Sequence, residues 1–148
     1  MRLLIQRVTN GSVTINDGEK RNIDSGAVVF LGIKADDTRE IVVKMAEKLL
    51  TLRFCEDSEG KTNLSLMDTK GELLIVSQFT LYADCSGGRR PSFIQAARPE
   101  TAIPLYEAFV EEVQKSGLIV ETGEFGADML VDIANDGPFT IWVDSEEL

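Results

Sequence analysis

The stretch Glu72–Asp84 constrains the fold more than any other part of the sequence, because polar residues follow directly on an unbroken apolar run. That run, Leu73–Val76, is typical of a strand buried on both faces. Since side chains alternate along a strand, one face is expected to carry Leu74, Val76, Gln78, Thr80 and Tyr82. Such a strand either forms the floor of a pocket or emerges into solvent, and the pattern alone leaves both open.

Apolar periodicity and turn-forming residues predict the other elements around this strand. Strands are expected over 2–15 with a break at Asn10-Gly11, after the turn at 16–18, over 27–33, over 129–134 and over 139–143. Helices are expected from Asp37, as N-cap, to about Arg53, and over 101–116. Residues 1–148 are therefore expected to form one α+β domain. In it, two main helices cover largely antiparallel, barrel-like β-sheets.

The four residues Asn135-Asp136-Gly137-Pro138 are all turn formers, and their composition favours a hairpin turn between the last two strands. A Gly-Pro bond also adopts the cis form at low cost, which turns its carbonyl groups in an unusual direction.

The absence of histidine excludes several kinds of chemistry. It rules out Ser-His-Asp and Cys-His catalysis, histidine general bases and imidazole metal sites. The two cysteines, Cys55 and Cys85, form neither a metal motif nor a disulfide framework, which favours a reducing cytoplasm. We therefore expect no metal and no cofactor, and catalysis by backbone groups, hydroxyls, carboxylates, lysine or the substrate itself.

The charge of the chain is unevenly distributed. Its net charge of −10 argues against binding long nucleic acids. Residues 1–98 hold 14 Lys/Arg and 13 Asp/Glu, whereas residues 99–148 hold 1 and 12. Contact with a short piece of RNA is thus expected through the first part only. The longest apolar run, Ala27–Ile33, is too short to span a membrane, and Gln6 and Arg7 interrupt any secretory signal.

The segment Cys85–Phe93 places two adjacent cations, Arg89 and Arg90, after the flexible pair Gly87-Gly88. Paired arginines in a glycine-rich loop suit phosphate binding. A mobile surface loop is an equally good interpretation of the same residues.

Taken together, several separate segments resemble the D-aminoacyl-tRNA deacylase family. The two signature motifs are Ser77-Gln78-Phe79-Thr80-Leu81 and Asn135-Asp136-Gly137-Pro138-Phe139-Thr140. Residues 5–8, 90–93 and 122–129 also fit, so the resemblance covers nearly the full length in order. Phe139 departs from it, because we expect a smaller residue such as valine there; a larger side chain would narrow that edge of the pocket.

The resemblance implies a homodimeric cytoplasmic enzyme of translation proofreading. It would hydrolyse the ester between a D-amino acid, or glycine, and the 3′ end of tRNA. Backbone N–H groups near Phe79 and Thr80 would stabilise the oxyanion, with Thr80 positioning substrate and the ribose hydroxyl assisting. Ser77 and Gln78 would line the ester or adenosine site, Met129 the pocket wall, and Arg89-Arg90 would meet a phosphate. A cis Gly137-Pro138 pair would reach into the partner's active site and reject L-amino acids.

Two alternatives remain at this point. The chain is a non-catalytic dimer that binds a nucleotide or an RNA end, or it is a sister deacylase with a trans Gly-Pro pair that accepts small L-amino acids. Turnover separates the enzyme from the binding module, and D against L substrates separates the two deacylases.

Overall fold

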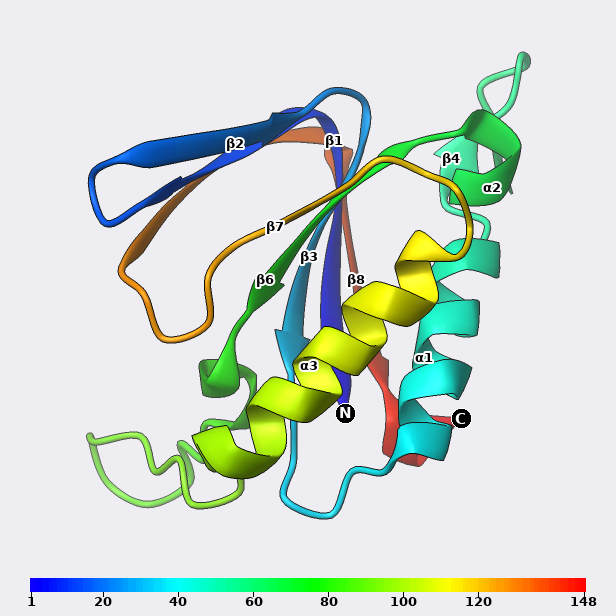
Figure 1. Ribbon diagram of the computed structural model, residues 1–148. Helices are drawn as coiled ribbons and strands as arrows, with labels where there is room; N and C mark the ends of the chain where they lie inside the picture. The colour runs from blue at the N-terminus through cyan, green and yellow to red at the C-terminus, as the bar shows by residue number, and fades with distance from the viewer.

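Strand β1 (Arg2–Ile15) is the centre of the six-stranded sheet in the computed structural model, which describes residues 1–148 (Figure 1). It pairs antiparallel with β2 (Glu19–Ile23), with β3 (Gly26–Gly32) and, over almost its whole length, with β8 (Met129–Asp144). The turn at residues 16–18 joins β1 to β2 as a hairpin, as expected, and Asn16 and Asp17 both have positive φ there. The long β1 thus brings the first and last parts of the chain together.

The rest of the sheet is parallel. Strand β6 (Glu72–Ser77) runs parallel to β3, and β7 (Val120–Thr122) runs parallel to β6. Leu73–Val76 is fully buried, as the apolar run predicts. The short β7 was not predicted, because three residues are too few to carry a periodic pattern.

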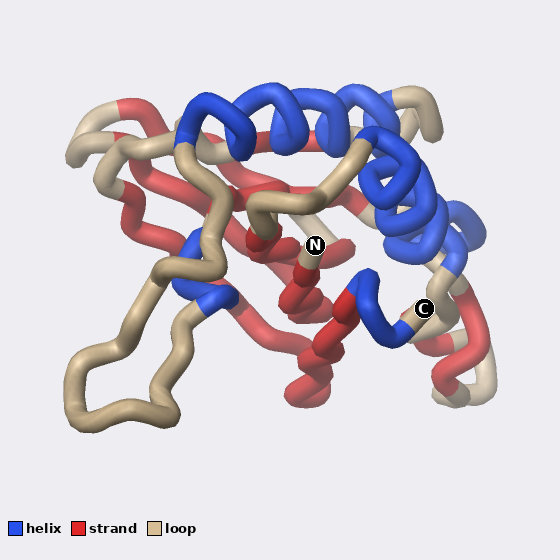
Figure 2. The backbone as a smooth tube through the Cα atoms, turned by 90° about the horizontal axis from the view of Figure 1, so that it is seen from below, coloured by secondary structure: helices blue, strands red, loops and turns tan.

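Helices α1 (Arg39–Thr51) and α3 (Pro99–Gln114) pack together on one side of the sheet (Figure 2). Alternate residues of β1 and β3, among them Leu3, Ile5 and Val29, join the inner faces of both helices in a core cluster of 23 buried residues. A second cluster of 7 buried residues lies under the curled half of the sheet, around Val8, Val13 and Val28.

The segment between α1 and β6 forms three short elements. It contains the two-stranded β4 (Cys55–Glu56) and β5 (Thr62–Leu64), followed by the one-turn helix α2 (Leu66–Thr69). Ser65 and Asp68 cap α2 reciprocally, and Lys70 ends it in the left-handed conformation. The last turn, η2 (Ser145–Glu147), follows β8.

The expected fold class is confirmed: the chain is a single α+β domain whose sheet is nearly barrel-shaped, and two main helices cover it. No helix is long and apolar enough to cross a membrane.

The hairpin predicted at 135–138 is wrong, because the two expected strands are halves of the one strand β8. Both halves pair with β1, and the register shifts between Gln6 and Val8 and again between Val8 and Asn10. Residues 136–139 bulge out of the ladder, and the Asn135 side chain closes the bulge. Its amide nitrogen donates to the carbonyl groups of Arg7 and Phe139, and its oxygen accepts from the Phe139 N–H. The side chain therefore supplies hydrogen bonds that a strand partner would otherwise make.

Two further boundaries differ from expectation. The break predicted at Asn10-Gly11 is absent: β1 is continuous there, and its nearest register shift against β8 lies just before, between Val8 and Asn10. Thr38, and not Asp37, is the N-cap of α1, because the Asp37 carboxylate accepts hydrogen bonds from the Met1 ammonium and the Lys34 N–H.

Candidate active site

The site begins where β6 ends. The strand stops at Ser77, and Gln78 is the N-cap of a 3₁₀-helix, η1 (Phe79–Tyr82). The prediction of one strand to Asp84 is therefore wrong beyond Ser77, and Gln78, Thr80 and Tyr82 do not share a strand face. Tyr82 is buried and Thr80 is exposed, because the chain turns instead of continuing straight.

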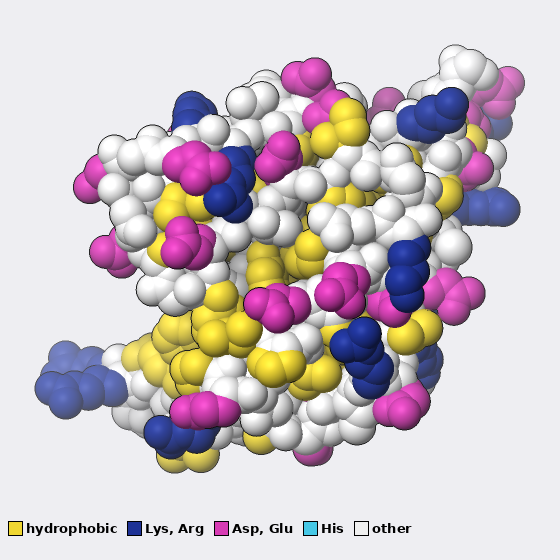
Figure 3. All heavy atoms as spheres, in the orientation of Figure 1, with side chains coloured by type: hydrophobic (Ala, Val, Ile, Leu, Met, Phe, Trp, Pro, Cys, Tyr) yellow, Lys and Arg dark blue, Asp and Glu magenta, His cyan; other side chains and the backbone are white.

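A pocket of about 390 Å³ opens beside this turn. From the end of β6 and the start of η1 come Ser77, Gln78 and Phe79, and from β8 comes Met129. The structure thus brings these four predicted site residues together from the middle and the last part of the chain. The space-filling view shows hydrophobic side chains gathered around the hollow near the start of α3 (Figure 3). The remaining lining residues are Val76, Phe125, Gly126, Ala127, Asp128 and Val131.

Two contacts shape the pocket wall from behind. A Cβ atom at Gly123 would lie 2.5 Å from the Met129 sulfur, so a larger residue at 123 would require the Met129 side chain to shift. The Tyr106 hydroxyl of α3 donates to the Ile75 carbonyl of β6 at 2.9 Å. Burial raises the pKa of Tyr106 to about 12, which keeps this hydroxyl protonated at neutral pH.

Thr80 lies beside the pocket and does not line it. Its hydroxyl accepts a hydrogen bond of 2.6 Å from the Gln78 side-chain amide. The backbone N–H groups of Phe79 and Thr80 have no hydrogen-bond partner within the protein, because they lie in the first turn of η1, where no preceding helical carbonyl can accept from them. Asp128 is the only ionisable side chain among the pocket residues. The arrangement offers free N–H donors but no base next to the Thr80 hydroxyl.

The loop with the two predicted cations begins beside η1 and extends away from the body of the protein (Figures 1 and 2). Arg89 and Arg90 are exposed, make no ion pair and do not line the pocket. Phe93, at the other end of the loop, stacks edge-to-face on Phe79 with ring centroids 5.1 Å apart. This contact and the bridge between Asp84 and Ser92 attach the base of the loop to the site.

Gly137 and Pro138 are exposed on the bulge of β8, and their peptide bond is cis. They do not line the pocket of their own chain. Arg7 lies under the bulge: its guanidinium contacts the Asp136 carbonyl at 3.2 Å and carboxylate at 3.4 Å, and it lies over the Phe139 ring at 4.7 Å. Arg7 therefore fixes the two residues that flank Gly137 and Pro138. This pair lies apart from the residues of the first signature motif.

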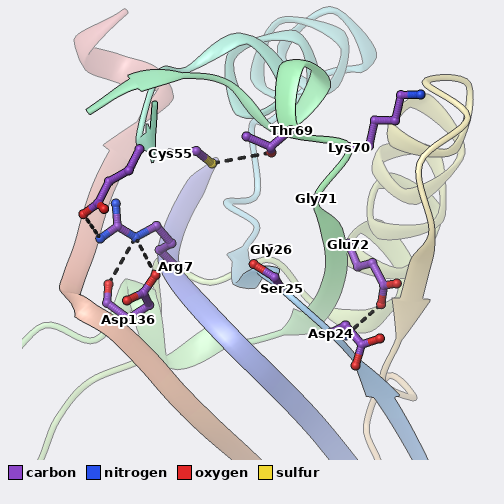
Figure 4. Close-up of a pocket in the computed structure, with 11 residues that line it drawn as sticks. Arg7, Asp24, Ser25, Gly26, Cys55, Thr69, Lys70, Gly71, Glu72 and Asp136 are labelled. Carbon is purple, nitrogen blue, oxygen red and sulfur yellow. Dashed lines mark hydrogen bonds and ion pairs between the residues drawn. The ribbon is translucent and has the colours of Figure 1, made fainter. Parts of the chain in front are cut away.

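Arg7 also lines a second, polar pocket of about 380 Å³ (Figure 4). It donates there to the Phe54 carbonyl and forms an ion pair with Glu56, and Asp136 lines the pocket beside it. Cys55 lies at the edge of this pocket, and burial raises the pKa of its thiol. No group of three or more acidic or cysteine side chains gathers as metal ligands would.

Sequence reasoning missed the part that Arg7 plays and the pocket role of Phe125 to Asp128. For Arg7 a signal was present, since a charged residue occupies an inward position of β1 between apolar ones. For Phe125 to Asp128 the only signal was the family resemblance of residues 122–129, because a loop without periodicity does not indicate which side chains it turns inward.

Comparisons with known proteins agree along the whole chain. The family model described as D-Tyr-tRNA(Tyr) deacylase matches residues 4–144. A D-aminoacyl-tRNA deacylase of Desulfotalea psychrophila is 55% identical over 148 residues, which is 100% of this chain and 99% of the relative. One from Thermosipho africanus is 50% identical over 148 residues with the same coverage.

Two solved structures share the fold. The c-Myc DNA unwinding element binding protein superposes with a TM-score of 0.90 and 42% identity, covering 97% of this chain and 98% of the other. A probable eukaryotic D-amino acid tRNA deacylase superposes with a TM-score of 0.84, covering 96% and 97%. At 20% identity, the second likeness shows the fold alone.

Proposed function

The chain belongs to the D-Tyr-tRNA(Tyr) deacylase family, and from this we propose that it is a hydrolase of D-aminoacyl-tRNA that releases the D-amino acid and free tRNA. The observation that carries the proposal is the pocket in which Ser77, Gln78 and Phe79 meet Met129, within a chain that its deacylase relatives match from end to end. Removing mischarged amino acids makes the protein a proofreading enzyme, and we place it in the cytoplasm, where translation occurs.

The reaction suits a site without histidine. An aminoacyl ester is already activated, so the site needs to position water and stabilise negative charge. The water oxygen attacks the carbonyl carbon, the bond from that carbon to the ribose oxygen breaks, and the released ribose oxygen takes the proton. The unpartnered N–H groups of Phe79 and Thr80 are donors for the oxyanion. The neighbouring ribose hydroxyl of the substrate assists the proton transfer, since no side-chain base lies beside Thr80.

The remaining contacts fit the end of a tRNA. Ser77 and Gln78 line the ester or adenosine site, and Met129 forms the wall next to the amino acid. Arg89 and Arg90 stand at the tip of the loop in a protein of net charge −10, and without ion-pair partners they are free to meet a phosphate. A protein that contacts only the end of the tRNA needs few phosphate contacts, which is compatible with its acidic net charge.

We propose further that the site is completed by a second copy of the chain. The sheet face opposite the helices carries an apolar row across four strands, in which Trp142 pairs with Leu4, Leu4 with Phe30, and Phe30 with Val76. No helix covers this row (Figure 2), Trp142 is 44% exposed, and Val76 lines the pocket. A partner bound to this row would bring its own Gly137-Pro138 pair toward the pocket. That pair would then reject L-amino acids and accept D-amino acids or glycine.

Hydrolysis of D-Tyr-tRNA against L-Tyr-tRNA tests the proposal, with glycyl-tRNA as a third substrate. We expect release of D-tyrosine and glycine, and L-Tyr-tRNA left intact. Equal turnover of the D and L substrates would contradict chiral selection, and turnover of small L-aminoacyl-tRNA would favour the sister activity.

A binding module is the second candidate, because the 42% identical solved structure is of a protein described as binding DNA. The same assay separates the two functions. Protein that binds D-Tyr-tRNA in a filter assay and leaves its ester intact would be a binder and not a deacylase.

A further inference from the structure

Helix η1 carries the two free N–H groups of the proposed site, yet it has little stability of its own. It is four residues long, and the hydrogen bonds at its two ends are Leu81 N–H to Gln78 O at 3.3 Å and Ala83 N–H to Thr80 O at 3.0 Å. Hydrogen bonds of a 3₁₀-helix have poor geometry, and isolated short helices do not persist in water. Contacts from elsewhere in the chain must therefore hold η1 in place.

Arg2, the first residue of β1, makes such contacts. Its Nη1 donates to the Leu81 carbonyl at 2.9 Å, and its guanidinium lies over the Tyr82 ring, 4.3 Å from the centroid. Gln78 donates to the Thr80 hydroxyl, but it is the neighbouring N-cap. Arg2 is the only side chain from a distant part of the sequence that hydrogen-bonds to η1.

The guanidinium is itself fixed from the other side. Its Nε donates to the Asp144 carboxylate at 2.7 Å, and the guanidinium carbon lies 5.2 Å from the centroid of the Trp142 ring. Asp144, at the end of β8, is 6% exposed and also accepts from the Glu146 N–H. Burial alone would raise the pKa of Asp144, but these hydrogen bonds hold it below its ordinary value, so the carboxylate is charged at neutral pH. Arg2 thus links β8 to η1.

We propose that Arg2 is a positioning residue of the active site, which holds η1 so that the Phe79 and Thr80 N–H groups face the developing oxyanion. The inference rests on the proposed function, since it assigns to η1 the role described there. Its geometry needs an arginine: one planar guanidinium donates in two directions and lies flat on an aromatic ring. A lysine ammonium at the same place keeps the charge near Asp144 but cannot also reach the Leu81 carbonyl and cover Tyr82.

The test compares Arg2→Lys and Arg2→Ala with the matched control Arg39→Ala. Arg39 is exposed on α1 and only approaches Glu111 at 3.6 Å. The readouts are kcat and KM on D-Tyr-tRNA below the melting temperature, native mass, and amide hydrogen exchange at Leu81 and Ala83. We expect kcat of both Arg2 variants to fall about 10- to 100-fold, because a small displacement of the N–H donors from the reacting carbonyl costs that much in rate. KM should change by less than about threefold. Their Leu81 and Ala83 amides should exchange roughly tenfold faster or more, since local opening sets that rate.

The two readouts together decide the role of Arg2. Faster exchange with kcat within twofold of wild type would overturn it, and so would a lower kcat with unchanged exchange at η1. Exchange is read on the folded protein and does not depend on turnover. Wild-type protein that fails to hydrolyse D-Tyr-tRNA would overturn the proposed function, whereas wild-type turnover that Arg2→Lys retains in full would overturn only the inference about Arg2.

Discussion

At the scale of single residues, Gly137 occupies a backbone conformation that few other residues adopt. Its φ is +132°, and an added Cβ would lie 3.1 Å from the Phe139 nitrogen and 3.2 Å from an Arg7 guanidinium nitrogen. We expect Gly137→Ala to cost about 1–3 kcal/mol of folding free energy. For a chain of this length, each kcal/mol lowers Tm by roughly 2–4 °C.

Gly87→Ala is the control for this prediction, because Gly87 has no atom within 4 Å of its added Cβ and no left-handed φ. Calorimetry of the two variants should show a lower Tm for Gly137→Ala only. Equal melting of both variants would show that the bulge of β8 adapts to a side chain at residue 137.

Thr80 is expected to position substrate and not to act as a nucleophile. Its hydroxyl accepts from Gln78, and no base lies beside it to remove its proton. Thr80→Ser should stay within a few-fold of wild-type kcat, and Thr80→Ala should keep measurable turnover. Mass spectrometry of the protein quenched during turnover should find no acyl group on residue 80. An acylated Thr80 would show that the reaction passes through the enzyme.

Phe139 illustrates a residue whose surroundings the sequence did not predict. A large side chain there was expected to narrow the edge of the pocket; Phe139 does not line the pocket of its own chain, and its effect on the pocket of a second copy stays a prediction. The ring packs against the main core cluster and under the Arg7 guanidinium. Because the bulge of β8 shifts the strand register, the side chain turns to the helix side of the sheet, and a shift of this kind leaves no mark in the local pattern.

At the scale of elements, the loop that carries Arg89 and Arg90 should contribute binding and not chemistry. We expect the double variant Arg89→Ala/Arg90→Ala to raise KM several-fold and leave kcat unchanged. It should also reduce the slope of log affinity against log salt by about 1.4, if each arginine meets one phosphate of a single strand.

The control for the loop is Arg39→Ala/Arg53→Ala, which removes the same charge from exposed positions outside the loop. Binding of D-aminoacyl-tRNA is measured for both double variants from low to moderate salt. If both weaken binding equally, the effect comes from net charge and not from this loop.

The elements themselves were predicted where the signal is local, and missed where distant residues decide. The buried run of β6 and the stripes of α1 and α3 follow from apolar periodicity, and each is confirmed. The turn from β6 into η1 was missed, because the contact that supports it comes from Arg2, 79 residues before Leu81 in the sequence. The site was predicted by its motif residues, yet the pocket that joins Met129 to Ser77 depends on the folded sheet.

At the scale of the whole molecule, the two faces of the sheet are covered unequally. Both long helices lie on one face, over the larger core cluster. On the other face the row from Trp142 through Leu4 and Phe30 to Val76 has no helix over it. Apolar side chains left partly exposed side by side mark interaction sites, and this row leads from the 44% exposed Trp142 to Val76 at the pocket.

A single lysine in this row should therefore prevent two copies from associating. In Leu4→Lys the ammonium would stand at the centre of the row, where a partner would have to bury it without a counter-charge. We expect a species of one 16.3 kDa chain by light scattering, where wild type should give two. Turnover of D-Tyr-tRNA should fall with it, because Gly137 and Pro138 do not reach the pocket of their own chain.

Leu130→Lys is the matched control: Leu130 is 64% exposed on β8 but lies outside the row, so this variant should keep the mass and activity of wild type. A Leu4→Lys protein that keeps both the paired mass and full activity would mean that the face is not the interface. A single chain with full activity would mean that one copy holds the complete site.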